Sequence, residues 1–184
     1  MDRAVFLDRD GVICRNRRDH VKSWEEFVFL PGSLAALARL AAAPVRIVVV
    51  TNQAVINRGI VPVATVEDIH ARMVDAIHAA GGRVDRVLYC PHRPDEQCDC
   101  RKPQPGLLKQ AAQEFGVDLS RSYVVGDALS DVGAAKAAGC APYLVLTGRG
   151  WQQWWASLLN RDNGFVVLPD LNAAVTHILE ETCT

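Results

Sequence analysis

The sequence predicts an α/β fold with a doubly wound parallel sheet and helices on both of its faces. Short runs rich in β-branched residues alternate with helical stretches along the chain. Most of these runs are continuous in Val, Ile and Leu, which is typical of strands buried on both sides of a parallel sheet. The length of 184 residues allows a substantial core, so we expect one domain spanning residues 1–184.

Six strands are expected, and most are short apolar runs. The second strand contains Ile47-Val48-Val49-Val50, a continuous β-branched run. In chain order, the predicted strands are residues 4–8, 45–51, 85–90, 122–126, 142–147 and 164–167.

Five helices are expected between and after these strands. Ser33 and Thr65 carry hydroxyls that can cap a helix N-terminus, and Gly116 and Gly139 are typical of residues that end a helix. The predicted helices are residues 33–43, 65–81, 105–116, 130–139 and 170–181.

Composition and charge exclude several classes of partner. The formal net charge is −1, so no overall basic field attracts nucleic acid or an anionic membrane. No apolar run approaches the ~20 residues that span a bilayer, and a strand begins almost at the N-terminus, which leaves no room for a signal peptide. We therefore expect a cytoplasmic protein with no nucleic-acid or membrane partner, and nothing in the sequence demands more than a monomer.

The run Asp8-Arg9-Asp10-Gly11 places two carboxylates at the end of the first predicted strand. Like charges held close repel, and each resists losing water, so a bound cation would relieve the cost. A plain acidic turn is the alternative interpretation. A calcium loop fits poorly, because the twelfth residue from Asp8 is Asp19, where such a loop needs glutamate, and Gly11 is fourth instead of sixth.

Other strand ends carry polar groups that are expected on the same rim of the sheet. Together these groups can carry out phosphate-monoester hydrolysis. Asp8 can act as nucleophile and Asp10 as acid and then base. Thr51 and Lys102 can stabilise the phosphoryl oxygens, while Asp127 can complete a Mg²⁺ site with Asp8 and a backbone carbonyl. Each residue alone also has an ordinary structural interpretation, so the argument depends on their order and placement together.

These residues resemble the four motifs of the haloacid dehalogenase-like phosphatases, in the same order. The motifs are Asp8-Arg9-Asp10-Gly11, Thr51-Asn52-Gln53, Lys102 and Gly126-Asp127-x-x-x-Asp131, within roughly residues 4–147. The resemblance implies a Rossmann-like core with Asp8 as nucleophile and Asp10 as acid/base. It also implies that Asp8, the Asp10 carbonyl and Asp127 hold Mg²⁺. The positions where this family inserts a large cap domain hold only loops here.

Residues 90–100 contain the pattern C-x-H-x5-C-x-C. Three thiolates and one imidazole match a closed, four-ligand structural zinc site, and the ligands would be Cys90, His92, Cys98 and Cys100. Such a site would fix the loop that leads into Lys102. A cluster of free thiols with a chance histidine is the alternative. The remaining cysteines, at positions 14, 140 and 183, are interpreted as ordinary small residues.

This loop resembles those of two phosphatase families, which act on D,D-heptose 1,7-bisphosphate and on histidinol phosphate. The heptose family is favoured by Trp24-Glu25-Glu26-Phe27, Thr51-Asn52-Gln53 and Asn57-Arg58-Gly59, with histidinol phosphate as the alternative. The expected substrate is thus a small phosphorylated metabolite. By the resemblance, substrate contacts are expected from Asn52, Gln53, Arg58 and Arg101.

Other features remain open at this stage. The basic residues Arg15, Arg17 and Arg18 can meet a distal phosphate or form a solvated loop. Ala54 and Ala128 replace a serine and a lysine that are common in the heptose family, so the sequence leaves the exact sugar and its anomer open. The tryptophans at positions 151, 154 and 155 have helical spacing and are interpreted as core or as a face for a partner.

Overall fold

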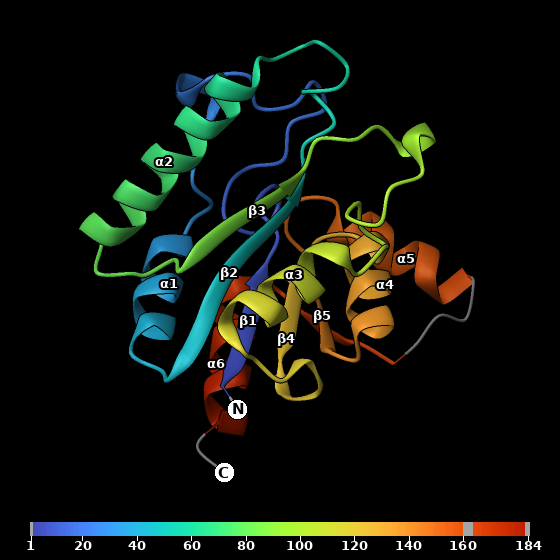
Figure 1. Cartoon of the computed structure of the whole chain (residues 1–184). Helices are drawn as coiled ribbons and strands as arrows, with labels where there is room; N and C mark the ends of the chain where they lie inside the picture. Colours follow the sequence, from blue (N-terminus) through green and yellow to red (C-terminus); the bar gives the residue numbers. More distant parts are fainter. Residues whose placement is uncertain (1, 160–163, 183–184) are drawn as a thin grey trace.

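One parallel sheet carries every named strand of the protein (Figure 1). This computed structural model describes residues 2–159 and 164–182. Within these ranges the strands run in the order β3-β2-β1-β4-β5-β6, and each neighbouring pair is parallel. The strands are β1 (Arg3–Leu7), β2 (Val45–Asn52), β3 (Arg86–Cys90), β4 (Tyr123–Gly126), β5 (Ala141–Val145) and β6 (Val166–Leu168).

The strand order creates a crevice at the carboxyl edge of the sheet. The chain moves outward from β1 through β2 to β3, and then returns to pair β4 with the other side of β1. Loops on either side of β1 therefore diverge at its carboxyl end, the usual ligand position in an open α/β sheet. Asp8 directly follows β1, and Asp127 directly follows β4.

Helices cover both faces of the sheet (Figure 1). On β1, Val5 and Leu7 face one core cluster, and Ala4 and Phe6 face the other, because successive side chains of a strand point to opposite faces. The first cluster includes residues of α1 (Ser33–Ala41), α2 (Val63–Ala79) and α6 (Leu171–Thr182). The second includes residues of α3 (Gly106–Phe115) and α4 (Leu129–Ala138). This arrangement confirms the predicted doubly wound α/β fold.

The predicted strands and helices all occur, with ends that coincide or shift by at most two residues. A sixth helix, α5 (Gly150–Leu159), was missing from the expected set. Trp151 and Trp155 are 51% and 53% exposed on it, so the interpretation of these two residues as core is wrong. Short 3-10 turns also occur at Trp24–Glu26, Pro94–Glu96 and Leu119–Arg121. Cys183 lies outside the described residues.

Both predicted helix N-caps are wrong, whereas both predicted ends are confirmed. Ser33 is the first residue of α1, behind a Gly32 cap, and its hydroxyl donates to the Leu30 carbonyl. Helix α2 begins after Pro62, so Thr65 lies inside its first turn. Gly116 and Gly139 cap α3 and α4 with φ of 64° and 80°, where a glycine has no Cβ clash.

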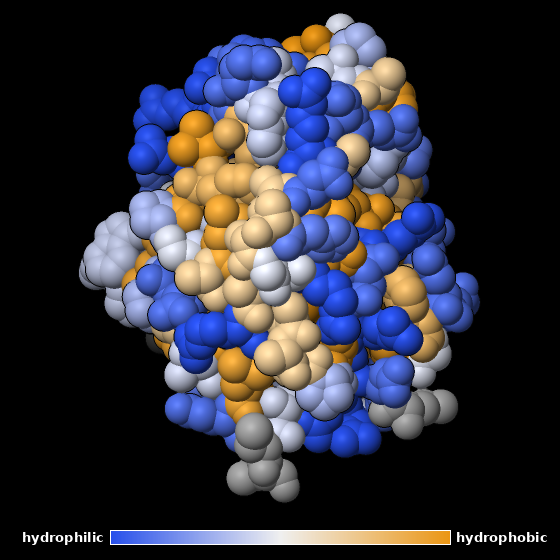
Figure 2. Space-filling model, turned by 90° about the vertical axis from the view of Figure 1, so that its left-hand side faces the viewer, coloured by the Kyte–Doolittle hydropathy of each residue, from blue (hydrophilic) through white to orange (hydrophobic). Residues whose placement is uncertain are grey.

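Hydrophilic and apolar residues are interspersed over the face of the molecule seen in Figure 2, as is usual for a protein surface. Among the described residues, we find no helix whose length and apolar character would let it cross a bilayer.

Candidate active site

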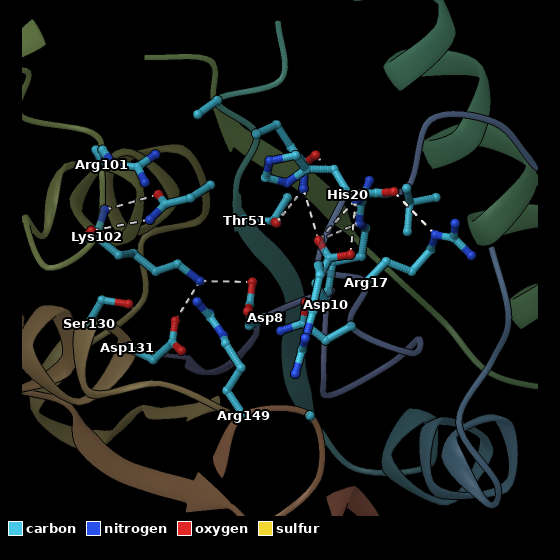
Figure 3. A pocket seen from close by; sticks show the side chains of 18 of the residues that line it. Asp8, Asp10, Arg17, His20, Thr51, Arg101, Lys102, Ser130, Asp131 and Arg149 are labelled. Atoms are coloured by element: carbon cyan, nitrogen blue, oxygen red, sulfur yellow. Dashed lines mark hydrogen bonds and ion pairs between the residues drawn. The ribbon is translucent and has the colours of Figure 1, made fainter. Parts of the chain in front are cut away.

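A pocket of about 540 Å³ opens at the carboxyl edge of the sheet. The predicted catalytic residues Asp8, Asp10, Thr51 and Lys102 all line it. The predicted substrate-binding residues Asn52, Gln53, Arg58 and Arg101 line it as well. Figure 3 shows Arg101 and Lys102 on one side of the pocket and Arg17 and His20 on the other. The fold therefore gathers residues from five separate segments of the chain, within 8–21, 51–58, 101–102, 130–131 and 148–152, around one cavity.

The floor of the pocket contains a buried cluster of charges centred on Lys102. Its Nζ lies 2.9 Å from Oδ1 of Asp8 and 2.6 Å from Oδ1 of Asp131, and it donates to the Val50 carbonyl (Figure 3). Burial raises the pKa of Asp8 to about 7, although the charge of Lys102 opposes this. Burial also acts against the charge of Lys102, but Asp131 and Asp8 outweigh it and raise the pKa of the amine.

Asn52 and Arg101 hold the segment that presents Lys102. The Asn52 side chain donates to the Lys102 carbonyl and accepts from its amide, both at 3.1 Å. Arg101 donates to the His92 carbonyl at 3.0 Å. The Asn52 amide therefore positions Lys102 directly, and its contact with substrate stays a prediction.

Asp10 lies in a polar network on the other side of Asp8. Arg9 donates to both carboxylate oxygens of Asp10, at 3.2 and 3.1 Å. The Gln53 amide donates to Asp10 at 3.0 Å and to the Thr51 hydroxyl at 2.9 Å. Because Gln53 bridges the two groups, Asp10 and Thr51 have fixed relative positions at the pocket wall.

Asp127 is fully buried beside this floor, and its carboxylate lies where side chains on two neighbouring residues would clash with it, so both of these residues are glycines. A Cβ on Gly11 would lie 2.1 Å from Oδ2 of Asp127, and one on Gly148 would lie 2.3 Å from it. The backbone amide of Arg149 donates to the same oxygen at 2.8 Å, and its guanidinium pairs with Oδ1 at 3.1 Å. Burial raises the pKa of Asp127, and the charge of Arg149 acts against the rise.

Three buried carboxylates have the chemistry of a divalent-cation site. Oxygens of Asp8, Asp127 and Asp131 lie within 4.8 Å of one another. The oxygen ligands of Mg²⁺ lie about 2.1 Å from the metal, so opposite ligands are about 4.2 Å apart. The spacing fits such an ion, and a bound cation would be stabilised because it relieves the repulsion among the three buried carboxylates.

The four residues of the predicted zinc loop also converge. The Sγ of Cys100 lies 3.0 Å from Cys90, 3.5 Å from Cys98 and 3.2 Å from Nδ1 of His92. Zn–S bonds of about 2.3 Å in a tetrahedron would place two sulfurs about 3.8 Å apart. The observed spacings are slightly shorter, and this donor set suits zinc.

Comparison with known proteins agrees with the geometry. The chain is 42% identical to the D-glycero-beta-D-manno-heptose-1,7-bisphosphate 7-phosphatase of Pseudomonas aeruginosa, across 96% of this chain and 97% of that protein. It is 43% identical to the Bordetella bronchiseptica protein of the same name, across 97% and 99%. The chain belongs to the haloacid dehalogenase-like phosphatases. The family model described as HAD-hydrolase-like also matches residues 99–174.

Solved structures of this phosphatase family share the whole fold. The B. bronchiseptica D,D-heptose 1,7-bisphosphate phosphatase, complexed with magnesium and phosphate, has a TM-score of 0.90 at 42% identity and covers 97% of this chain and 99% of its own. The Burkholderia thailandensis enzyme has a TM-score of 0.75 at 38% identity, covering 97% and 99%. Phosphatases of this family use Mg²⁺, as that complex illustrates.

Sequence reasoning assigned no role to several residues of this phosphatase site. Arg149 pairs with Asp127, and its position just after the fifth predicted strand could have indicated it. Arg9 is buried, and the Cys14 thiol donates to Asp10 at 3.7 Å. Arg17 and Arg18, for which the sequence left open a contact with a distal phosphate, line the pocket as well.

Proposed function

We propose that this protein hydrolyses the 7-phosphate of D-glycero-β-D-manno-heptose 1,7-bisphosphate through an aspartyl-phosphate. One observation carries the proposal. The Asp8 carboxylate lies on the floor of the pocket, with Lys102 2.9 Å away and Asp127 within the same buried carboxylate cluster. The names of the two relatives with 42% and 43% identity support the sugar and its β anomer.

The first step forms the covalent intermediate. An oxygen of Asp8 attacks the phosphorus, and the bond between phosphorus and the sugar oxygen breaks with its electron pair on that oxygen. Asp10 gives its proton to the departing oxygen. Lys102 and the Thr51 hydroxyl donate to the phosphoryl oxygens as negative charge develops on them.

The second step releases phosphate. Asp10, now a carboxylate, takes a proton from water, and the water oxygen forms a bond to phosphorus while the bond to Asp8 breaks. Asp8, the Asp10 carbonyl and Asp127 would hold Mg²⁺, which supplies positive charge beside the phosphoryl oxygens. Asp131 holds Lys102 in place through the 2.6 Å ion pair.

The second phosphate of the substrate would meet the basic rim of the pocket. Arg58 and Arg101 line it, and Arg58 is 3.3 Å from Nε2 of His20. Burial, and then the charge of Arg58, lower the pKa of His20. We propose that zinc bound by the four residues of the 90–100 loop holds Arg101 toward this rim.

The proposal also covers the domain organisation, assembly and location of the chain. We propose that the chain forms a single domain, since all six strands of the described residues share one sheet. We further propose that it acts as a monomeric, cytoplasmic enzyme. Its substrate is a small phosphorylated metabolite, and its net charge of −1 gives no general attraction for nucleic acid or membranes.

The test measures Mg²⁺-dependent phosphate release from both anomers of the heptose bisphosphate and from histidinol phosphate. We expect the β anomer to give the highest kcat/KM. Asp8→Asn, which keeps the shape but removes the nucleophilic charge, should abolish turnover, while Asp68→Asn, at an exposed position of α2, should not. Full activity of Asp8→Asn would refute the covalent mechanism, and a preference for histidinol phosphate would refute the substrate.

A further inference from the structure

A buried chain of side chains runs from Asp10 into helix α2. Arg9, only 1% exposed, donates to both oxygens of Asp10 and to Oε1 of Gln53 at 3.1 Å. The remaining terminal nitrogen of its guanidinium, Nη1, lies 3.0 Å from Nε2 of His70. His70 is itself buried, so no bulk water replaces this contact.

Hydrogen-bond chemistry fixes the form of His70. A guanidinium has only donors, so Nε2 of His70 must accept with its lone pair and carry no proton. Burial, and then the charge of Arg9, lower the pKa of His70 to about 3, which keeps the ring neutral at physiological pH. Tyr89 of β3 contacts the ring with centroids 5.5 Å apart, and its hydroxyl donates to Glu67 of α2. The acceptor is thus held in one orientation.

We propose that His70 is a positioning residue for the acid/base step, because it holds the Arg9 guanidinium in the orientation that donates hydrogen bonds to both oxygens of Asp10. This inference depends on the role of Asp10 under the proposed function. With one end of the guanidinium on His70 and the other on Asp10, rotation about the Arg9 side chain would break bonds at both ends. A displacement of Asp10 by about 1 Å can cost as much as 10²-fold in rate.

A positioning role for Asp10 has a chemical signature that loss of folding does not share. Proton donation matters for a sugar oxygen, which is a poor leaving group as an alkoxide. It matters little for p-nitrophenyl phosphate, whose phenolate leaves as a stable anion. A misplaced Asp10 should therefore slow phosphoryl transfer to Asp8 more from the sugar phosphate than from the aryl phosphate, whereas hydrolysis of the aspartyl-phosphate is common to both substrates.

The experiment compares kcat/KM, which reports the steps up to departure of the leaving group, for the heptose bisphosphate and for p-nitrophenyl phosphate in His70→Leu, His70→Gln and wild type. We expect His70→Leu to lower sugar-phosphate kcat/KM about 10- to 100-fold and aryl-phosphate kcat/KM by less than about threefold. His70→Gln, whose amide oxygen can accept from Arg9, should recover most of the loss. Asp10→Asn should show the same preference for the aryl substrate. His78→Leu, at an exposed position of the same helix, should match wild type on both.

Several outcomes would overturn the proposal. Equal losses on the two substrates, or no rescue by His70→Gln at an unchanged thermal midpoint, would leave His70 with a structural role alone. If His70→Leu does not fold, His70→Asn replaces it, since its shorter amide falls short of Arg9, and the same ratio decides. A wild-type enzyme inactive on both substrates would refute the proposed function, whereas an active wild type with equal losses would refute the His70 role alone.

Discussion

Replacing Lys102 by methionine should destabilise the protein as well as inactivate it. The ammonium is within 2.9 Å of Asp8 and 2.6 Å of Asp131, and all three side chains are less than 10% exposed. Methionine has a similar length but no charge. The substitution therefore leaves two buried carboxylates facing each other with no cation between them.

The loss should be about 3–5 kcal/mol at pH 8, the range for removing one partner of a buried ion pair. At an effective dielectric constant of ~20, each pair at these distances attracts by about 6 kcal/mol before the cost of desolvating the ions. Since a domain has about 5–15 kcal/mol of stability in total, the variant should still fold. The double variant with Asp131→Asn should recover part of the loss, because it removes one of the two facing charges.

The loss should also depend on pH in a definite direction. Burial raises the pKa of Asp8 from 3.8 to about 7, so between these values the native state binds more protons than the unfolded chain. Stability therefore falls as pH rises through this window. Removing Lys102 takes away the charge that opposes the shift, so the variant should lose more at pH 8 than at pH 5.

Urea unfolding without added Mg²⁺ measures this effect. Lys109→Met, at an exposed position of α3, is the matched control and should change stability by less than about 0.5 kcal/mol. A Lys102→Met loss as small as that of Lys109→Met would contradict the buried-charge argument. So would a double variant whose loss is the sum of the two single losses.

Three further predictions concern zinc, a glycine and the buried histidine. Cys98→Ser should reduce the zinc content from about one ion per chain and lower the thermal midpoint of the protein. Cys140→Ala, which lies outside the four proposed zinc ligands, should keep its zinc, and equal zinc content in the two variants would exclude the site. Gly11→Ala should weaken Mg²⁺ activation more than Gly32→Ala, because both have positive φ but only Gly11 faces Asp127, and metal titrations of activity measure this. With a folded pKa of about 3 against 6.5 unfolded, His70 contributes stability above pH 6.5 that is lost as pH falls. Between pH 6.5 and 5 this loss amounts to about 2 kcal/mol. Because His70→Gln cannot titrate at this position, its free energy of unfolding, measured with urea, should fall by about 2 kcal/mol less than that of wild type over the same pH range. An equal fall in the variant and in wild type would contradict a buried neutral ring.

The elements that sequence analysis located best were those with a strong local signal. A buried parallel strand needs apolar side chains on both faces, so the runs that became β1, β2 and β4 were evident, and the residues at their ends followed from the geometry of parallel sheets. The predicted N-caps Ser33 and Thr65 were wrong because the observed caps, Gly32 and Pro62, make no side-chain hydrogen bond to their helices. Such caps begin a helix through backbone conformation and leave no hydroxyl or amide signal in the sequence. Helix α5 was not among the expected helices, although the helical spacing of its tryptophans indicated one.

The partners of Asp10 and Asp127 could not be found in the same way. Arg9 is adjacent to Asp10 in sequence, but its pairing with His70 spans 61 positions and depends on how α2 packs beside β3. A histidine within a helix gives no sequence signal for this contact, because its register relative to Arg9 is set by tertiary packing. The motifs therefore identify the groups proposed to react, whereas the residues that orient them appear only once the helices are in place. For this reason the leaving-group test on His70 examines a property that the motifs alone do not predict.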